Sequence, residues 1–270
     1  MSQTESFSKY DDLEKKSTLD LLHIINNEDK KVPIIISKSL KSINTFIDEV
    51  YNRMKKGGRL FYIGSGTPGR LGVVDASECP PTFGVSNNVI IGIIAGGDTA
   101  IRNSIEGAED NIEKGWYDLK TYNISSSDSV LGVSSSGRTP YVVGALEKCN
   151  KYNIYTGLLT SNNDTIAEKH AVSIIRTLLG PEVVTGSTRM KSGTAQKLIL
   201  NMISTSLMIK MGRVKGNKMV DMKLSNSKLI KRGQRFLQDE LGINSDEARK
   251  LLEKTKSVRD SIKLYKKKES

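Results

Sequence analysis

A short stretch near residue 60 combines a predicted strand, a glycine-rich turn and a carboxylate. Leu60–Ile63 is apolar and predicts a buried strand, and Gly64–Gly69 follows it at once. Small residues let the backbone approach a ligand, and the helix that we expect from Arg70 would point its N-terminus at an anion. Pro80 and the next proline should stop this helix, so we expect Glu78 to lie at its end. The stretch predicts an anion cradle with an acidic group nearby.

The same residues also fit an ordinary strand–turn–helix, since a lone glycine-rich turn is a weak signal. No Lys-Ser or Lys-Thr pair closes the turn, which argues against a nucleoside triphosphate as the ligand. A dinucleotide-binding fold would also need an acidic residue at the end of the next strand, and no convincing one stands there. A phosphorylated small molecule is therefore the better candidate.

Two further loops are rich in serine, threonine and glycine. Ser134–Pro140 directly follows a predicted strand over Ser129–Val133, and Gly180–Thr194 precedes a predicted buried helix over Ala195–Met211. In parallel sheets, ligands bind at the carboxyl ends of the strands, so we expect these loops to converge with the first one. Hydroxyls and backbone N–H groups together can hold a phosphate without a metal.

Strands that alternate with helices predict an α/β fold, with a parallel sheet flanked by helices on both faces. The expected domains are an N-terminal helical segment over residues 1–45, a phosphosugar-binding domain over 46–222 and a C-terminal helical extension over 223–270. The other expected elements are a helix that starts near Ser17, one that follows Pro33 and ends at Gly57, strands over Val89–Ala95, Ile154–Leu159 and His170–Ile175, a helix from Asp98 to about Trp116, and a helix capped by Asn244.

Two carboxylates could divide acid and base roles between them. The prolines argue for a fixed orientation of Glu78, and Glu109 lies on the helix that we expect from Asp98. A pair of carboxylates in different environments can act as general acid and general base. We interpret the neighbouring Glu106 and Asp110 as solvated helix charges.

Composition narrows the class of protein. The net charge of +11 comes partly from a lysine-rich C-terminus, and no nucleic-acid-binding motif accompanies it, so we expect no nucleic-acid partner. Two cysteines without a CxxC pattern argue against a disulfide framework and a zinc site. No signal sequence and no apolar run of membrane-spanning length is visible, which favours a cytoplasmic protein that is not bound to membranes.

Four long strings resemble those of one enzyme family, and the resemblance covers the chain from about Thr18 to Leu251. The strings are IGSGTPGRLGVVDASECPPTFGV, IIAGGDTAIRNSIEGAED, SSSGRTPYVVGAL and GPEVVTGSTRMKSGTAQKLILNMIST. They closely resemble N-acetylmuramic acid 6-phosphate etherases, which have the sugar isomerase (SIS) fold and usually act as dimers. The resemblance implies a phosphosugar substrate, a homodimer and no cofactor.

The reaction that this resemblance implies is a lyase reaction. Such enzymes remove D-lactate from C3 of N-acetylmuramic acid 6-phosphate and yield N-acetylglucosamine 6-phosphate in peptidoglycan recycling. They are thought to open the ring to an aldehyde, eliminate the lactyl ether and add water. The family's acid matches Glu78, and its second glutamate matches Glu109. The residues expected to bind the substrate are Ser65, Gly66, Thr67, Ser135, Ser136, Gly137, Arg138, Thr139, Ser187 and Lys191.

The chain departs from the family pattern at several positions. Pro68 stands where the family has a serine, and it removes one N–H donor from the turn. Ser134 and Ser135 stand where alanines are usual and could supply hydroxyls. The N-terminal pattern TExRN becomes Thr4–Ser8, TESFS, and the C-terminal helical repeat occurs once. Two alternatives of the same fold follow: a non-catalytic regulator that binds phosphosugars, like the glucokinase regulatory proteins, and a phosphosugar isomerase. The retained glutamates favour the etherase.

Overall fold

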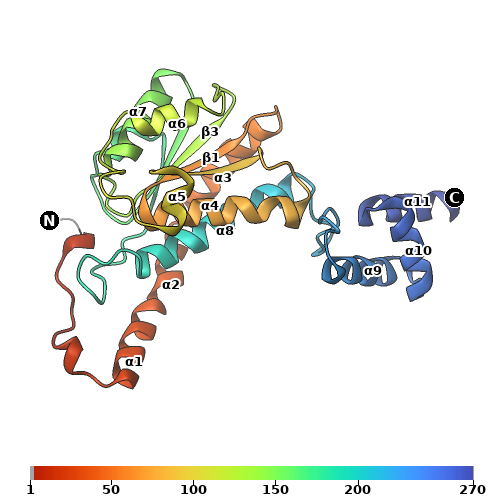
Figure 1. The fold of residues 1–270 in the computed structure, drawn as a ribbon, viewed down its shortest axis with the longest axis horizontal. Helices are drawn as coiled ribbons and strands as arrows, with labels where there is room; N and C mark the ends of the chain where they lie inside the picture. The colour runs from red at the N-terminus through yellow and green to blue at the C-terminus, as the bar shows by residue number, and fades with distance from the viewer. Residues whose placement is uncertain (1–2, 270) are drawn as a thin grey trace. The chain divides into compact units, whose positions relative to one another are not determined.

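The computed structural model describes residues 3–269, and the chain divides into two compact units. The first unit runs to Ser77 and resumes over Asn88–Ser204, and the second comprises Glu78–Asn87 and the chain from Thr205 onward. Figure 1 shows the elements of both units in chain order. The expected domains over 1–45, 46–222 and 223–270 stay a prediction.

A parallel sheet forms the centre of the first unit, and it confirms the predicted α/β fold. Within the described residues the sheet has five strands in the order β2-β1-β3-β4-β5, and every neighbouring pair is parallel. The strands are β1 Leu60–Gly64, β2 Ile90–Ile94, β3 Ser129–Val133, β4 Tyr155–Thr160 and β5 Ser173–Arg176. Strands β2 and β3 lie on opposite sides of β1, so the order in which strands are added to the sheet reverses between β1 and β3. In such sheets, ligands bind at the carboxyl ends of the strands at this point.

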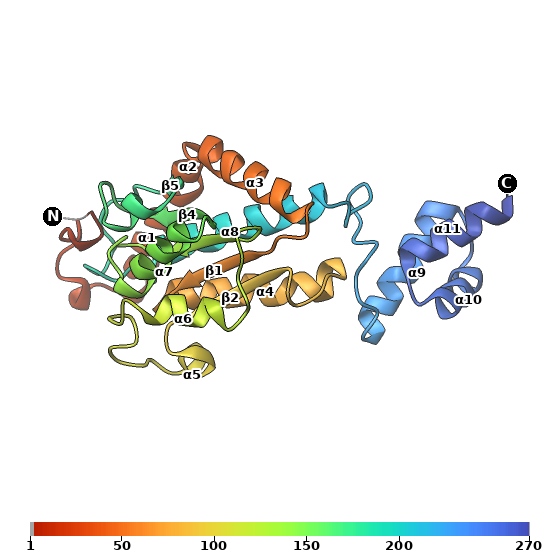
Figure 2. The ribbon, with the colours of Figure 1, turned by 90° about the horizontal axis from the view of Figure 1, so that it is seen from above.

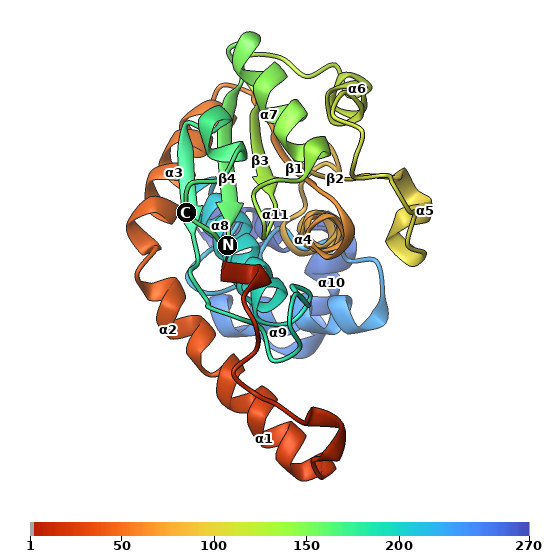
Figure 3. The same ribbon diagram turned by 90° about the vertical axis from the view of Figure 1, so that its left-hand side faces the viewer.

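Helices cover both faces of this sheet. A side chain at Gly132 of β3 would meet Val142 of α7 (Pro140–Lys151), while one at Gly157 of β4 would meet Phe46 of α3 (Leu40–Met54). Gly132 pairs with Leu158, so Gly157 faces the other way. Views from above and from the end show α6 (Lys114–Lys120) with α7 on one face, and α3 on the other (Figures 2 and 3). The sheet is therefore buried on both sides.

The N-terminal helices differ in part from the prediction. Helix α1 (Thr18–Asp29) begins as expected, with the Ser17 side chain accepting from the backbone N–H of Asp20. The single helix expected after Pro33 is instead two, α2 (Lys31–Ser37) and α3, broken at Ser39. The Ser39 hydroxyl donates to the carbonyl of Arg176 at the end of β5, so tertiary contact, rather than sequence pattern, interrupts the helix.

Helix α4 corrects a second prediction. It begins at Gly66 and runs to Phe83, passing through both prolines that we expected to stop it. Proline fits helical φ angles and removes one N–H, so burial of the last turn can outweigh its cost. Phe83 is buried, and the helix ends at Gly84, whose φ of +65° suits glycine.

The helix predicted from Asp98 to Trp116 is also wrong. Helix α5 (Gly97–Arg102) is short, and α6 begins only at Lys114. The intervening segment contains Glu106, Glu109 and Asp110, so these carboxylates lie on a loop instead of on a helix.

The second unit is a small helical cluster at the C-terminal end. Helix α8 (Lys191–Lys210) leads into it, followed by α9 (Ser227–Leu241), α10 (Ser245–Thr255) and α11 (Val258–Glu269). Leu237, Leu252 and Val258 lie in its separate apolar core. Asn244 caps α10 as predicted, in a reciprocal capping box with Glu247. No helix within the described residues has the length and apolar character needed to cross a membrane.

Candidate active site

A cavity of about 260 Å³ lies where β1 and β3 end. Strand pairing sets Gly64 of β1 beside Val133 of β3, so the loops that follow the two strands start at the same level. Most of the residues that line the cavity carry hydroxyls or carboxylates: Glu5, Ser65, Gly66, Thr67, Pro68, Glu109, Ser134, Ser135, Ser136, Thr139 and Thr188. Two of the three predicted hydroxyl-rich loops thus meet here, and the third contributes Thr188.

Glycine makes the first loop possible. A side chain at Gly69 would lie 2.6 Å from Ile94 of β2 and 2.8 Å from the carbonyl oxygen of Gly64. The start of α4 therefore packs directly against the sheet, and its free N–H groups face the region just beyond β1. Helix α7 begins just beyond β3 with Pro140 in its first turn, as predicted. Two helix N-termini border the cavity, an arrangement that favours a phosphate.

Hydrogen bonds hold the second loop in shape before any ligand binds. The Ser134 hydroxyl accepts from the backbone N–H of Gly137 at 3.0 Å and lies 2.9 Å from the hydroxyl of Thr139. Gln196 of α8 donates to the Ser135 hydroxyl at 2.8 Å. These contacts fix the hydroxyl positions, so little conformational entropy remains to be lost on binding.

Glu109 reaches this cavity from its loop. The Ser65 hydroxyl donates to the Glu109 carboxylate at 2.7 Å, and the backbone N–H of Tyr141 in α7 donates to the Glu109 carbonyl at 3.0 Å. The first contact orients the side chain, and the second fixes the backbone of the loop that carries it. An adjacent hollow of about 230 Å³ shares Glu109 and is also lined by Arg70, whose Nε donates to the carbonyl of Ile101. Glu109 thus stands between two hollows.

Glu78 occupies a different place in the fold. It is exposed on α4, in the segment Glu78–Asn87 that groups with the second unit, and it does not line the cavity. The role expected for Glu78 stays a prediction.

Four predicted binding residues lie outside the cavity lining. Gly137 adopts φ of +63° and shapes the second loop, and Arg138 beside it is exposed. Ser187 takes part in a turn, where its N–H donates to the carbonyl of Val184. Lys191 is buried, and its ammonium donates to the Glu28 carboxylate at 2.7 Å and to the carbonyl of Leu179 at 3.1 Å. The ammonium thus has two partners inside the protein, and the substrate role expected for Lys191 stays a prediction.

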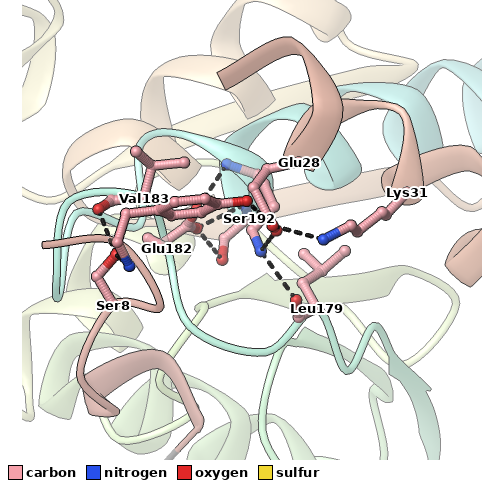
Figure 4. Close-up of polar contacts among 9 residues, drawn as sticks. Ser8, Glu28, Lys31, Leu179, Glu182, Val183 and Ser192 are labelled. Atoms are coloured by element: carbon pink, nitrogen blue, oxygen red, sulfur yellow. Dashed lines mark hydrogen bonds and ion pairs between the residues drawn. The ribbon is translucent and has the colours of Figure 1, made fainter. Parts of the chain in front are cut away.

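The ion pair of Lys191 belongs to a larger buried group that Figure 4 shows. Glu28 also accepts from Lys31 and from the Tyr10 hydroxyl. Burial alone would raise the pKa of Glu28, but these hydrogen bonds outweigh it and lower the pKa to about 2. Glu182, which is also buried, accepts from the backbone N–H groups of Lys191 and Ser192 and caps α8. Two buried carboxylates, Glu28 and Glu182, therefore fix the start of α8: Glu28 binds the Lys191 side chain, and Glu182 binds the backbone.

Four cavity residues were not in the predicted site: Pro68 and Ser134, which the sequence marked only as departures from the family pattern, and Thr188 and Glu5. Thr188 belongs to a loop that the sequence already marked as rich in hydroxyls, and Glu5 belongs to the N-terminal pattern TESFS. The family-like Thr4-Glu5 pair was the available signal for Glu5. In the described part of the chain, no group of three or more His, Cys, Asp or Glu side chains is placed to bind a metal ion.

Solved structures of other proteins share the fold. A phosphoheptose isomerase from Francisella tularensis superposes with a TM-score of 0.58 at 14% identity, over 71% of this chain and 98% of that one. A putative phosphosugar isomerase involved in capsule formation from Bacteroides fragilis gives 0.57 at 14% identity, over 74% of this chain and 95% of its own. At this identity the likeness concerns the fold alone.

Sequence comparison identifies much nearer relatives. Residues 42–150 match a family described as the glucokinase regulatory protein N-terminal SIS domain. A protein from Bacteroides fragilis named N-acetylmuramic acid 6-phosphate etherase is 53% identical over 263 residues, 97% of this chain and 94% of that protein. A protein of the same name from Porphyromonas gingivalis is 52% identical over 265 residues, covering 98% and 97% of the two chains. The chain therefore belongs to the N-acetylmuramic acid 6-phosphate etherase family.

Proposed function

We propose that the protein is a carbon–oxygen lyase that converts N-acetylmuramic acid 6-phosphate to N-acetylglucosamine 6-phosphate and D-lactate. The observation that supports this most strongly is Glu109, which a serine hydroxyl orients at the edge of a hydroxyl-lined cavity, in a chain more than half identical to named etherases. The pathway served is the recycling of cell-wall sugars.

The substrate phosphate binds among the hydroxyls of Thr67, Ser136 and Thr139, beside Ser65, whose hydroxyl donates its hydrogen to Glu109. Backbone N–H groups at the start of α4 complement its charge. With its phosphate bound there, the carbon backbone of the open-chain sugar would lie next to Glu109. The Glu109 carboxylate accepts from Ser65 through one oxygen, and its second oxygen is free for the substrate.

The reaction then needs one base and one acid. In the open-chain form, the aldehyde acidifies the proton at C2, and a carboxylate is basic enough to remove it. We assign this step to Glu109. The electron pair forms the C2–C3 double bond while the C3–O bond breaks, and the leaving oxygen takes up a proton, so that lactate departs as a neutral alcohol. The family resemblance assigns this proton to Glu78, although Glu78 does not line the cavity. In the hydration step, water adds at C3 and gives a proton to the carboxylate that protonated lactate, while protonated Glu109 returns its proton to C2. The aldehyde itself activates the substrate, so the steps require no metal or nucleotide.

A direct test is lactate release from the phosphorylated muramic sugar, followed with a coupled lactate assay. Glu109→Gln removes the base and should lower the rate about 10²- to 10⁴-fold. The matched control is Glu113→Gln, which removes an exposed carboxylate near the end of the same loop. A Glu109→Gln rate within a few-fold of the parent rate would contradict the assignment.

A second candidate is a non-catalytic regulator that binds phosphosugars, and the match of residues 42–150 to a regulatory SIS domain supports it. Tight phosphosugar binding without lactate release would favour the regulator. We further propose that the enzyme is a cytoplasmic homodimer, as the family resemblance implies. Analytical ultracentrifugation would test the dimer.

A further inference from the structure

The N-terminal strap, residues 4–10, crosses the loops that follow the sheet and is attached at three points. Thr4 is buried, and its backbone and hydroxyl bond to the side chain of Asn162. The Ser8 hydroxyl donates to the carbonyl of Val183 at 2.6 Å (Figure 4). The Tyr10 hydroxyl donates to Glu28 at 2.8 Å. The strap is therefore a fixed part of the first unit, although it contains no long helix or strand.

These attachments hold Glu5 at the cavity. Asn162 donates to Thr4 and also to the carbonyl of Ser135, so it joins the strap to a loop that lines the cavity. Glu5 follows Thr4 directly and is itself a lining residue. Its carboxylate lies 3.5 Å from where a side chain on Gly186 would start, so the glycine leaves room for it.

The Glu5 carboxylate is available for a ligand. Among residues 3–269, no group donates a hydrogen bond to it, whereas the other lining carboxylate, Glu109, accepts from Ser65. The two carboxylates reach the cavity from separate segments, Glu5 beside the loop after β3 and Glu109 beside the loop after β1. One hydroxyl-lined cavity thus offers an anion cradle and two hydrogen-bond acceptors.

We propose that Glu5 is a substrate-binding residue that accepts a hydrogen bond from the sugar, either from a hydroxyl or from the acetamido N–H. A carboxylate repels a phosphate at close range, so its partner is an uncharged donor of the same ligand. The inference deepens the proposed function, because it assigns the recognition of the sugar part to the strap. A hydrogen bond to a charged acceptor changes affinity by about 10- to 100-fold.

Calorimetry with N-acetylglucosamine 6-phosphate tests this without turnover. Glu5→Ala should raise the Kd about 10- to 100-fold, while Glu14→Gln, an exposed carboxylate in the 3-10 turn Leu13–Lys15, should leave it unchanged. Inorganic phosphate is the second probe. Its affinity should stay the same or rise in Glu5→Ala, because the variant removes a negative charge and no phosphate contact. Glucose 6-phosphate, which lacks the acetamido group, distinguishes the two donors: if the variant effect disappears with it, the acetamido N–H is the partner.

Ser8→Ala tests the strap as the element that positions Glu5. It removes one attachment and should weaken sugar phosphate binding less than Glu5→Ala does, with no further loss in the double variant. The proposal for Glu5 is overturned if Glu5→Ala changes the sugar phosphate Kd by less than twofold, or weakens inorganic phosphate equally. Sugar phosphate binding that depends on Glu5 in a protein without lactate release would refute the lyase only. Lactate release with an unchanged Glu5→Ala Kd would refute the role of Glu5 only.

Discussion

Replacing Glu28 with glutamine should destabilise the first unit more than any exposed substitution in the same region. The Glu28 and Lys191 side chains are only 4% and 2% exposed, and their charged atoms are 2.7 Å apart. Glutamine keeps the shape of the side chain but removes its charge, so the Lys191 ammonium stays buried with neutral oxygen acceptors and no counter-charge. Breaking a buried pair in this way costs about 3–5 kcal/mol.

The reverse substitution should cost less. Lys191→Met leaves Glu28 with two of its three donors, Lys31 and Tyr10. The double variant, Glu28→Gln with Lys191→Met, leaves no buried charge without a partner. Lys31 loses its ion pair with Glu28, but it is half exposed and stays solvated. We therefore expect Glu28→Gln to be the least stable of the three variants, with the double variant recovering part of the loss.

The same pair predicts how stability depends on pH. The folded-state pKa of Glu28 is about 2, below the ordinary value of 4.5. A lowered pKa means that the folded state favours the ionised carboxylate, so its contribution is complete above about pH 4.5 and is lost as the pH falls towards 2. The difference of about 2.5 pKa units corresponds to about 3 kcal/mol, in the range expected from breaking the pair.

Thermal unfolding followed by tryptophan fluorescence measures these effects. Trp116 is the chain's one tryptophan, and it is buried in the core of the first unit, so its signal reports that unit. A loss of 3 kcal/mol should lower the melting temperature by about 6–12 °C, and Glu14→Gln should lower it by less than about 2 °C. Equal midpoints for Glu28→Gln and Glu14→Gln would refute the reasoning. Lys191→Met that raises KM without loss of stability would instead support the substrate role first predicted for Lys191.

Two further predictions concern the first loop. Gly69→Ala should lower the free energy of unfolding by about 1–3 kcal/mol and weaken phosphosugar binding, because the new methyl group overlaps Ile94 and the Gly64 carbonyl; unchanged values in urea unfolding and calorimetry would show that the turn can move aside. Pro68→Ser should tighten phosphosugar binding about 2- to 10-fold, since it adds a hydroxyl and a free N–H in the first turn of α4 at the cavity. An unchanged Kd by calorimetry would mean that the other hydroxyls already satisfy the phosphate.

Sequence patterns predicted the sheet well but the helices less well. All five strands occur close to the expected residues. Buried parallel strands are continuous apolar runs, so they can be recognised in the sequence without knowing which strands pair. The helix around Glu109 failed because α5 ends at Arg102 and the carbonyl of Glu109 instead accepts from Tyr141, a residue 32 positions away. The prolines failed as a stop signal for α4 because burial of Phe83 outweighs a local preference.

The sequence alone determined the fold class, the family and the hydroxyl-rich loops that follow β1 and β3. These depend on local residue types and on long matching strings, which need no coordinates. Only the tertiary structure decided how the polar groups are used. It pairs Lys191 with Glu28, and it brings Glu5 to the cavity. The physical reason is that hydrogen bonds and ion pairs join residues far apart in the chain, and one sequence shows which charges exist but not which of them meet.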